Sequence, residues 1–203
     1  MKIIDPDNRR MIDLPGVGPC PRPVDIDQSM TGFHRLKSLR IYRFEPGPPI
    51  HGDSEVDEVV ILPLIGAFAM VITGAHPLSA SVSASGPTRA LYMTPDHAYI
   101  LTPQSPVMVA YARAKAQGRV PCQTLSTSDG VGVAEHLRCQ LVDLTSGQTL
   151  IPGWGGETLV QVVKGSLDVS GQTVAVGQTL ALLDAEAVTL RAKFDARLLI
   201  IGV

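Results

Sequence analysis

The fold is decided by the stretch Glu58-Val59-Val60-Ile61-Leu62-Pro63-Leu64-Ile65-Gly66, which recurs as Glu157-Thr158-Leu159-Val160-Gln161-Val162-Val163-Lys164-Gly165. Each copy begins with an acidic residue, continues as a mostly apolar run and ends at a glycine with the same spacing. Internal similarity of this kind indicates two copies of one structural unit. The sequence therefore predicts a duplicated architecture.

The similarity extends beyond this run on both sides. Leu39-Arg40 corresponds to Leu137-Arg138 upstream, and the stretch 86–91 corresponds to 177–182 downstream. Two units of this size fit the usual range for small domains. We therefore expect one barrel over residues 31–118 and a second over residues 119–203.

The patterning of the chain is that of β-strands. Short β-prone runs alternate with Gly, Pro and Ser, and the second copy shows period-two alternation, which is typical of strands with one buried face. The residues expected to share that face are Leu167, Val169, Val174, Val176, Leu180, Leu182, Val188, Leu190, Ala192 and Phe194. The predicted fold class is all-β.

Residues 1–30 differ in character from the rest of the chain. They contain five prolines, which exclude a central strand or a regular helix: Pro6, Pro15, Pro19, Pro21 and Pro23. We expect an extended N-terminal arm that lies over a barrel. Sheet edges and apolar outer faces also favour pairing of subunits, so the sequence predicts a homodimer.

Composition excludes several classes of partner. The 203 residues are 45% hydrophobic and 18% charged, with a net charge of -2 and no basic stripe, which argues against nucleic acid as a partner. The most apolar stretch, Val59 to Ile72, is interrupted by Pro63 and Gly66 and is too short to span a bilayer. We expect no membrane association.

The N-terminus and the cysteines indicate the compartment. The first 18 residues contain no apolar run of signal-peptide length, which argues against secretion. Cys20, Cys122 and Cys139 are odd in number and widely spaced, as in proteins of a reducing compartment, and they form no zinc motif. The sequence predicts a cytoplasmic protein.

Two segments of the first copy carry a family resemblance. Gly47-Pro48-Pro49-Ile50-His51 with the acidic loop to Glu58, and the later Tyr92–Tyr99 segment, resemble the two signature motifs of the cupin superfamily. Residues 33–116 look like the N-terminal half of the bacterial 5-deoxyglucuronate isomerases, which are related to the 4-deoxy-5-threo-hexosulose-uronate ketol-isomerases. This resemblance implies two tandem cupin barrels, also called double-stranded β-helices or jelly rolls, and a sugar-acid isomerase of carbohydrate metabolism.

The resemblance also shows where the metal ligands are missing. A metal-binding cupin presents His-x-His, a Glu and a distant His, and in the isomerases this set belongs to the C-terminal cupin. The matching region here, 151–157, retains only Glu157, and the strand that corresponds to the last His supplies Val188 and Leu190. A lone carboxylate cannot hold a catalytic divalent ion. For Glu157 a strand-edge carboxylate bonded to a turn is the favoured interpretation, and no metal is expected in this barrel.

The first copy retains more polar groups. His51, Asp53 and Glu58 follow a His-x-Asp-x-x-x-x-Glu spacing, and His97 or Tyr99 lies near the position of the distant His. These groups are candidates for a small-ligand pocket, and His51, Asp53, Glu58 and His97 are candidates for a weak divalent metal site. The alternative is a solvated acidic loop, and no cofactor is assigned.

The only tryptophan, Trp154, lies in a glycine-rich loop at the expected mouth of the second barrel. It is a candidate for stacking on a sugar ring or an apolar ligand, and equally for plugging the mouth or a subunit contact. Two hypotheses therefore stay open, and no catalytic residue is assigned. One is an isomerase-like enzyme or a degenerate relative that acts on small carbohydrate-derived compounds. The other is a non-catalytic bicupin module with a ligand-binding or regulatory role.

Overall fold

The computed structural model describes residues 1–85, 89–118, 120–126, 132–133, 136–152, 156–183 and 188–203. Strands make up 61% of the chain and helix is almost absent, which confirms the predicted all-β class. The one helical turn among these residues, α1 (Gln28–Thr31), starts at Asp27, whose side chain accepts a hydrogen bond from the Met30 backbone N–H.

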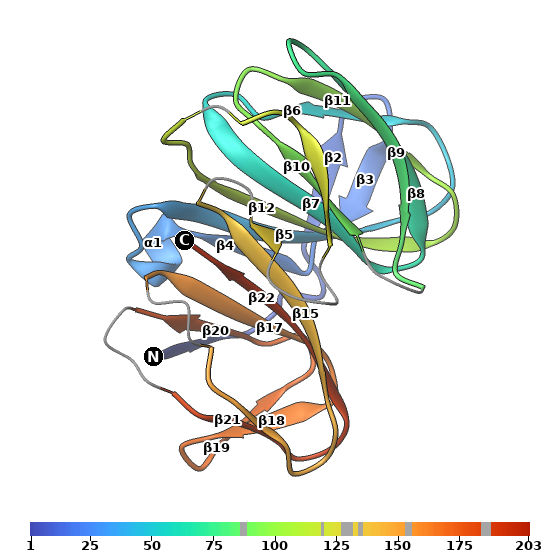
Figure 1. The fold of residues 1–203 in the computed structure, drawn as a ribbon. Helices are drawn as coiled ribbons and strands as arrows, with labels where there is room; N and C mark the ends of the chain where they lie inside the picture. The colour runs from blue at the N-terminus through green and yellow to red at the C-terminus, as the bar shows by residue number, and fades with distance from the viewer. Residues whose placement is uncertain (86–88, 119, 127–131, 134–135, 153–155, 184–187) are drawn as a thin grey trace.

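Each half of the chain forms a barrel of two sheets (Figure 1). In the first half a six-stranded sheet in the order β13-β10-β7-β12-β5-β4 faces a four-stranded sheet in the order β6-β11-β8-β9. The strands of this half are β4 (Val24–Asp27), β5 (Leu36–Phe44), β6 (Ile50–Asp53), β7 (Asp57–Ile65), β8 (Ala67–Thr73), β9 (Leu78–Ser83), β10 (Arg89–Met93), β11 (Ala98–Pro103), β12 (Val107–Lys115) and β13 (Gln123–Ser126).

The second half repeats this order strand for strand. Its six-stranded sheet runs β1-β20-β17-β22-β15-β14 and its four-stranded sheet runs β16-β21-β18-β19. The strands are β1 (Lys2–Ile4), β14 (Gly132–Val133), β15 (Arg138–Leu144), β16 (Thr149–Leu150), β17 (Thr158–Lys164), β18 (Ser166–Val169), β19 (Gln172–Ala175), β20 (Thr179–Leu182), β21 (Leu190–Ala192) and β22 (Ala196–Gly202). Strands β7 and β17, which carry the repeated sequence, occupy equivalent places.

The predicted arm of residues 1–30 contains strands of its own. β1 pairs with β20 on the edge of the second barrel, β4 pairs with β5 of the first, and β2 (Met11–Leu14) forms a hairpin with β3 (Gly18–Pro21). Conversely, β13 lies after residue 118 in the chain but pairs with β10 of the first barrel. The six-stranded sheet of each barrel therefore ends in a strand from outside its own predicted range, β13 in the first barrel and β1 in the second. The boundaries at residues 30 and 118 stay a prediction.

The two six-stranded sheets pack against each other and bury a shared core. Leu39, Leu62 and Ala112 from the first barrel lie in one apolar cluster with Leu159 and Ile201 from the second. Each of these sheets is thus covered on both faces, by its own barrel interior and by the other barrel. This explains why β7 is an almost continuous apolar run that is buried from Asp57 to Leu64.

The expected face of the second barrel is buried with two exceptions. Leu167, Val169 and Val174 belong to its core, together with Leu180, Leu182, Leu190 and Ala192, and Val188 packs against that core. Val176 and Phe194, however, are 59% and 70% exposed. Both residues follow the end of a strand, where side chains no longer alternate between the two faces of a sheet.

The remaining general features concern the cysteines and the membrane. Cys20 and Cys139 are buried, Cys122 is half-buried, and all three are free thiols. Within the described ranges, no helix has the length and apolar character needed to cross a bilayer.

Gly66 and Gly165 close the repeated run in equivalent geometry. Both have positive φ, and a Cβ at either position would overlap a backbone oxygen, that of Pro106 or of Asp195. We expect Gly66→Ala to lower the free energy of unfolding by about 3 kcal/mol, because backbone strain and a steric clash add. Gly147→Ala is the matched control, since Gly147 has positive φ but open space around it, and about 1 kcal/mol is expected there. Equal losses in denaturant titrations would contradict this account.

Candidate functional site

The carboxylate of Glu157 is bound by backbone N–H groups of the other barrel. It accepts hydrogen bonds from His34 at 2.5 Å, from Arg35 at 2.8 Å and from Leu36 at 2.6 Å, at the start of β5. Glu157 is itself buried. A buried carboxylate needs such donors, and three consecutive N–H groups satisfy most of its acceptor capacity. The residue that corresponds to a metal ligand is therefore directed out of its barrel.

Glu58 makes the equivalent contact in the opposite direction. Its carboxylate accepts hydrogen bonds from the backbone N–H groups of His136 at 3.4 Å and Leu137 at 3.1 Å, just before β15 of the second barrel. Glu58 is completely buried. The two glutamates of the repeat thus form a reciprocal clamp, in which each barrel binds the backbone of the other.

His97 is buried beside the turn between β10 and β11, and both of its ring nitrogens are engaged. Nδ1 lies 2.8 Å from the carbonyl oxygen of Pro95, and Nε2 accepts a hydrogen bond of 2.9 Å from the backbone N–H of His76. The rings of His76 and His97 stack with centroids 5.9 Å apart. In this tautomer Nε2 has no lone pair left for a metal ion.

His51 and Asp53 lie on the edge strand β6 with exposed side chains. Across the ladder His51 pairs with Ile100, which pairs in turn with Val71, and all three are exposed. Gly52, between the two polar residues, pairs with Tyr99, whose hydroxyl occupies the space that a Cβ at position 52 would need. His51 and Asp53 therefore alternate onto the outer face of the sheet and do not converge with Glu58 or His97.

The interior of the first barrel holds a small cavity with three tyrosines. Its volume is about 50 Å³, and Leu14 from the β2–β3 hairpin contributes to its wall. The other lining residues are Tyr42, Phe44, Ile50, His51, Ile61, Tyr99, Leu101, Val109 and Tyr111. Of the residues expected at a ligand pocket, Tyr99 and His51 are among those that line this cavity, although His51 is exposed.

Two tyrosines of the cavity, Tyr99 and Tyr111, are held in their neutral form. Burial raises the pKa of Tyr99 far above its ordinary value, and neighbouring Tyr111 adds to the effect. Burial also raises the pKa of Tyr111, to about 12. The two rings lie with centroids 6.3 Å apart. Such phenols donate hydrogen bonds at neutral pH but do not accept protons as bases.

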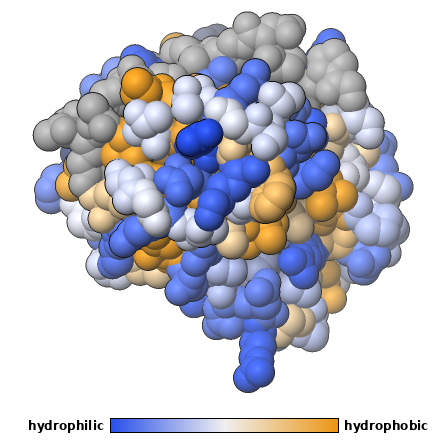
Figure 2. Space-filling model, turned by 90° about the horizontal axis from the view of Figure 1, so that it is seen from below, coloured by the Kyte–Doolittle hydropathy of each residue, from blue (hydrophilic) through white to orange (hydrophobic). Residues whose placement is uncertain are grey.

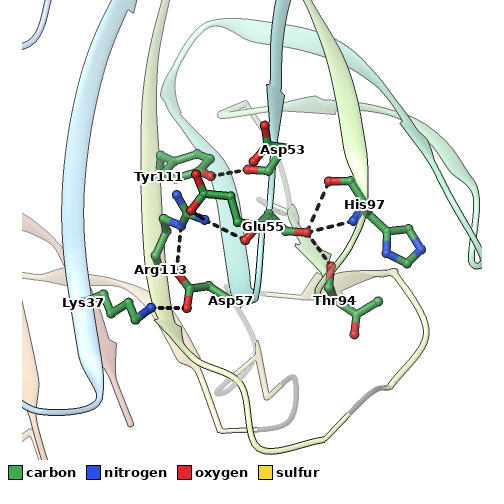
Figure 3. A network of polar contacts seen from close by, with 9 residues as sticks. Lys37, Asp53, Glu55, Asp57, Thr94, His97, Tyr111 and Arg113 are labelled. Atoms are coloured by element: carbon green, nitrogen blue, oxygen red, sulfur yellow. Dashed lines mark hydrogen bonds and ion pairs between the residues drawn. The ribbon is translucent and has the colours of Figure 1, made fainter.

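A polar network closes one end of the same barrel (Figure 3). Arg113 donates to the Ser54 carbonyl oxygen at 2.6 Å and pairs with Glu55 at 2.9 Å and with Asp57 at 3.2 Å. Lys37 pairs with the other oxygen of Asp57 at 2.5 Å. Two cations thus neutralise the buried Asp57, as a charge in this environment requires.

Ser54 and Tyr111 connect this network to the neighbouring loop and cavity. The Ser54 hydroxyl donates to the Thr94 carbonyl oxygen at 2.8 Å and accepts from the His97 backbone N–H at 3.0 Å. The Tyr111 hydroxyl donates to the carbonyl oxygen of Asp53 at 3.1 Å. The acidic loop is therefore folded onto the barrel by specific contacts and is not merely solvated.

The second barrel has an apolar interior. Its core consists of Leu, Val, Ile and Ala side chains. Leu190 belongs to it and Val188 packs against it, as expected, but Ile151, the first residue of the region that corresponds to the metal ligands, is 60% exposed. Trp154 and Gly153 lie outside the described residues. Apolar groups offer a divalent ion no coordination.

The donor set does not fit a cupin metal centre. In the part of the chain that the structure describes, no group of three or more His, Cys, Asp or Glu side chains is placed to hold an ion. His97 is used by backbone groups, Glu58 and Glu157 join the barrels, and His51 and Asp53 face outward. A divalent ion would find no converging ligands among them.

Sequence reasoning missed Tyr42, Tyr111 and Arg113. All three are on β5 or β12, whose residues alternate between the barrel interior and the shared core. Tyr42 and Tyr111 could have been found as aromatic residues in predicted strands. Their common cavity could not, because β5 and β12 are paired across a long separation in sequence.

The comparisons with known proteins identify the fold. No family model and no curated protein matches the chain. Among solved structures it is similar to the bacterial pirin YhhW from Escherichia coli in complex with nickel(II), with 14% identity, a TM-score of 0.76 and coverage of 100% of this chain and 99% of that chain.

Two further structures agree with this result. A quercetin 2,3-dioxygenase from Acinetobacter baumannii has 15% identity and a TM-score of 0.71 over 100% of this chain and 85% of that chain. An IolB-like protein from Salmonella typhimurium LT2 has 13% identity and a TM-score of 0.70 over 89% and 88% of the two chains. The chain therefore has the cupin fold, and likeness at these identities shows the fold alone.

We expect Glu157→Gln to weaken the joint between the barrels. The amide keeps the size of the side chain but replaces one acceptor oxygen by an NH₂ group that faces a backbone donor, so the free energy of unfolding should fall by about 2–3 kcal/mol. Asp168→Asn is the control, because among the described residues the Asp168 carboxylate accepts a hydrogen bond only from the local Gly171 N–H, at 3.1 Å. A loss at position 157 no larger than at position 168, measured by denaturant unfolding, would exclude a clamp.

The tyrosine cavity predicts a stability loss at high pH. A phenol whose pKa is higher in the folded than in the unfolded chain stabilises the fold fully below about pH 10, and this contribution disappears as the pH rises toward the folded pKa. We expect stability to fall between about pH 10 and 12, by on the order of 2 kcal/mol for Tyr111 alone. Tyr111→Phe should flatten this pH dependence in thermal unfolding. An unchanged slope in that variant would contradict the assignment.

Proposed function

We propose that this chain is a non-catalytic cupin module that binds a small, oxygen-bearing molecule in its N-terminal barrel. The observation that carries the proposal is the fate of the residues expected to do chemistry. Glu58 and Glu157 are used in the clamp, and backbone groups engage the His97 imidazole. Among the described residues, three tyrosines and His51 are the polar residues that line the cavity.

The cavity favours recognition over proton transfer. The neutral phenol of Tyr99 can donate to a carbonyl or hydroxyl oxygen of the ligand, while Phe44 and Ile61 offer apolar contacts to its carbon part. The cavity of about 50 Å³ limits the ligand to a few heavy atoms as long as Leu14 stays in place. A binding or regulatory module thus fits this interior better than an isomerase.

The isomerase-like enzyme is the second candidate, supported by the sequence motifs and by the IolB-like neighbour. The structure of the pirin neighbour contains nickel(II), so a metal-dependent function is part of this second candidate. The isomerase and any other metal-dependent function would both need side chains that converge on one metal ion. The homodimer and the cytoplasmic location also stay predictions.

Acetone provides a direct test of the binding proposal, because it combines one acceptor oxygen with two methyl groups. We expect it to shift the resonances of Tyr99 and Tyr111 in a protein labelled at tyrosine, and we expect Tyr99→Phe to weaken binding about fivefold through loss of one hydrogen bond. Tyr92→Phe is the matched control, since Tyr92 lies in the core between the barrels. Equal shifts throughout the protein, or no saturation, would contradict the pocket.

Elemental analysis and a turnover assay test the alternative on the same preparation. We expect no stoichiometric divalent metal and at most trace isomerisation of 5-deoxyglucuronate. Robust metal-dependent turnover that survives His51→Ala and disappears in a folded Glu157→Ala variant would overturn the proposal. That result would place a working metal site in the second barrel.

A further inference from the structure

We propose that the outer face of the second barrel carries a separate binding site for an anionic sugar, meaning a sugar ring that bears a phosphate or a carboxylate. A groove of about 520 Å³ crosses strands β18, β19 and β21 there. The residues that matter are Ser146, Asp168, Thr173, Arg191, Lys193 and Phe194. This volume lies within the range of small-molecule sites and is about ten times that of the tyrosine cavity.

Figure 2 looks onto the end of the molecule where these strands lie in Figure 1. Hydrophilic residues dominate this view, and small hydrophobic areas lie directly beside them. A surface of this mixed kind suits a ligand that has both polar groups and an apolar face. Extended apolar patches, by contrast, mark protein contacts.

Arg191 supplies a cation without an internal partner. In the ladder it stands opposite Asp168, but Asp168 accepts its hydrogen bond from the Gly171 backbone N–H in the β18–β19 turn. Within the described part of the chain, the Arg191 guanidinium makes no ion pair or hydrogen bond, and its side chain is exposed. A guanidinium in this state can bind a phosphate or carboxylate with two parallel hydrogen bonds.

Lys193 adds a second positive charge on the same face. Residues 191 and 193 are both exposed, while Ala192 between them is buried, so both cations point into the groove. The Lys193 ammonium donates to the Thr173 hydroxyl at 2.7 Å and has further N–H donors available. With Asp168 as the single acidic lining residue, the groove has a net positive charge on a chain whose total charge is -2.

Phe194 provides the contact for the ring. It is 70% exposed at the edge of the groove, although burial is the ordinary place for such a side chain. An aromatic face packs well against the C–H face of a sugar. The hydroxyls of Ser146 and Thr173 and the carboxylate of Asp168 are suitable partners for the sugar hydroxyls. Anion, ring and hydroxyls thus each have a matching group.

The test is a calorimetric titration of the full chain with glucose 6-phosphate, galacturonate, glucose and inorganic phosphate. We expect one or both anionic sugars to bind at least about tenfold more tightly than glucose or phosphate alone, because only they engage the cation and the aromatic face together. The affinity for glucose 6-phosphate compared with that for galacturonate shows whether the site prefers a phosphate or a carboxylate.

Variants locate the site and separate it from the barrel cavity. Arg191→Ala and Phe194→Ala should each weaken binding about tenfold without changing thermal unfolding, since both side chains are exposed. Lys164→Ala and Val176→Ala are matched controls, one exposed cation and one exposed apolar residue outside the groove, and should bind normally.

Several results would overturn this inference. Binding of phosphate alone as tight as that of the tighter-binding anionic sugar would reveal an unspecific anion patch. Binding that survives both groove variants but is lost in Tyr99→Phe would assign the sugar to the barrel interior. Failure of all four compounds to bind would exclude the site and would leave the acetone test of the tyrosine cavity unaffected.

Discussion

The reciprocal clamp of Glu58 and Glu157 is the interaction on which the rest of the molecule depends. Each carboxylate satisfies buried backbone N–H groups at the point where the other barrel begins, just before β15 or β5. Without these acceptors the N–H groups of Leu36 and Leu137 would lower the stability of the fold, because both residues are buried and have no access to water. Each charge is in turn compensated by the donors. Neither barrel can therefore complete its own hydrogen bonding alone.

The clamp also explains why two of the candidate ligands, Glu58 and Glu157, do not reach the barrel interiors. A glutamate that reaches across to the partner barrel cannot also point into its own barrel. The second interior is filled with apolar side chains, and the small cavity of the first is lined by three tyrosines, His51 and apolar side chains. The cupin fold tolerates this change because its stability comes from the sheets and the shared core. The fold of this chain therefore does not require a set of ligands inside either barrel.

Sequence reasoning reached the fold, but it could not tell on which face of a strand the candidate ligands lie. The repeat ending at Gly66 and Gly165 reflects local strand and turn geometry, which spacing records directly. The candidate ligands depended on which face of β6 points inward, and a shift of one residue reverses that choice. Gly52 points inward and His51 outward. The His-x-Asp spacing is therefore present, but its two side chains lie on the outer face of β6. The pairing of β1 with β20 is equally invisible, because it joins opposite ends of the chain.

The same alternation indicates where functional groups can still reside. In β21 the inward positions Leu190 and Ala192 are committed to the core, and outward Arg191 is free of that constraint. A cation at such a position costs little stability, so it can be kept or lost according to what it binds. Phe194 is different, since an exposed aromatic ring lowers solubility and contributes nothing to the core. Its place beside Arg191 and Lys193 fits the proposed binding of an anionic sugar on the outer surface of the barrel.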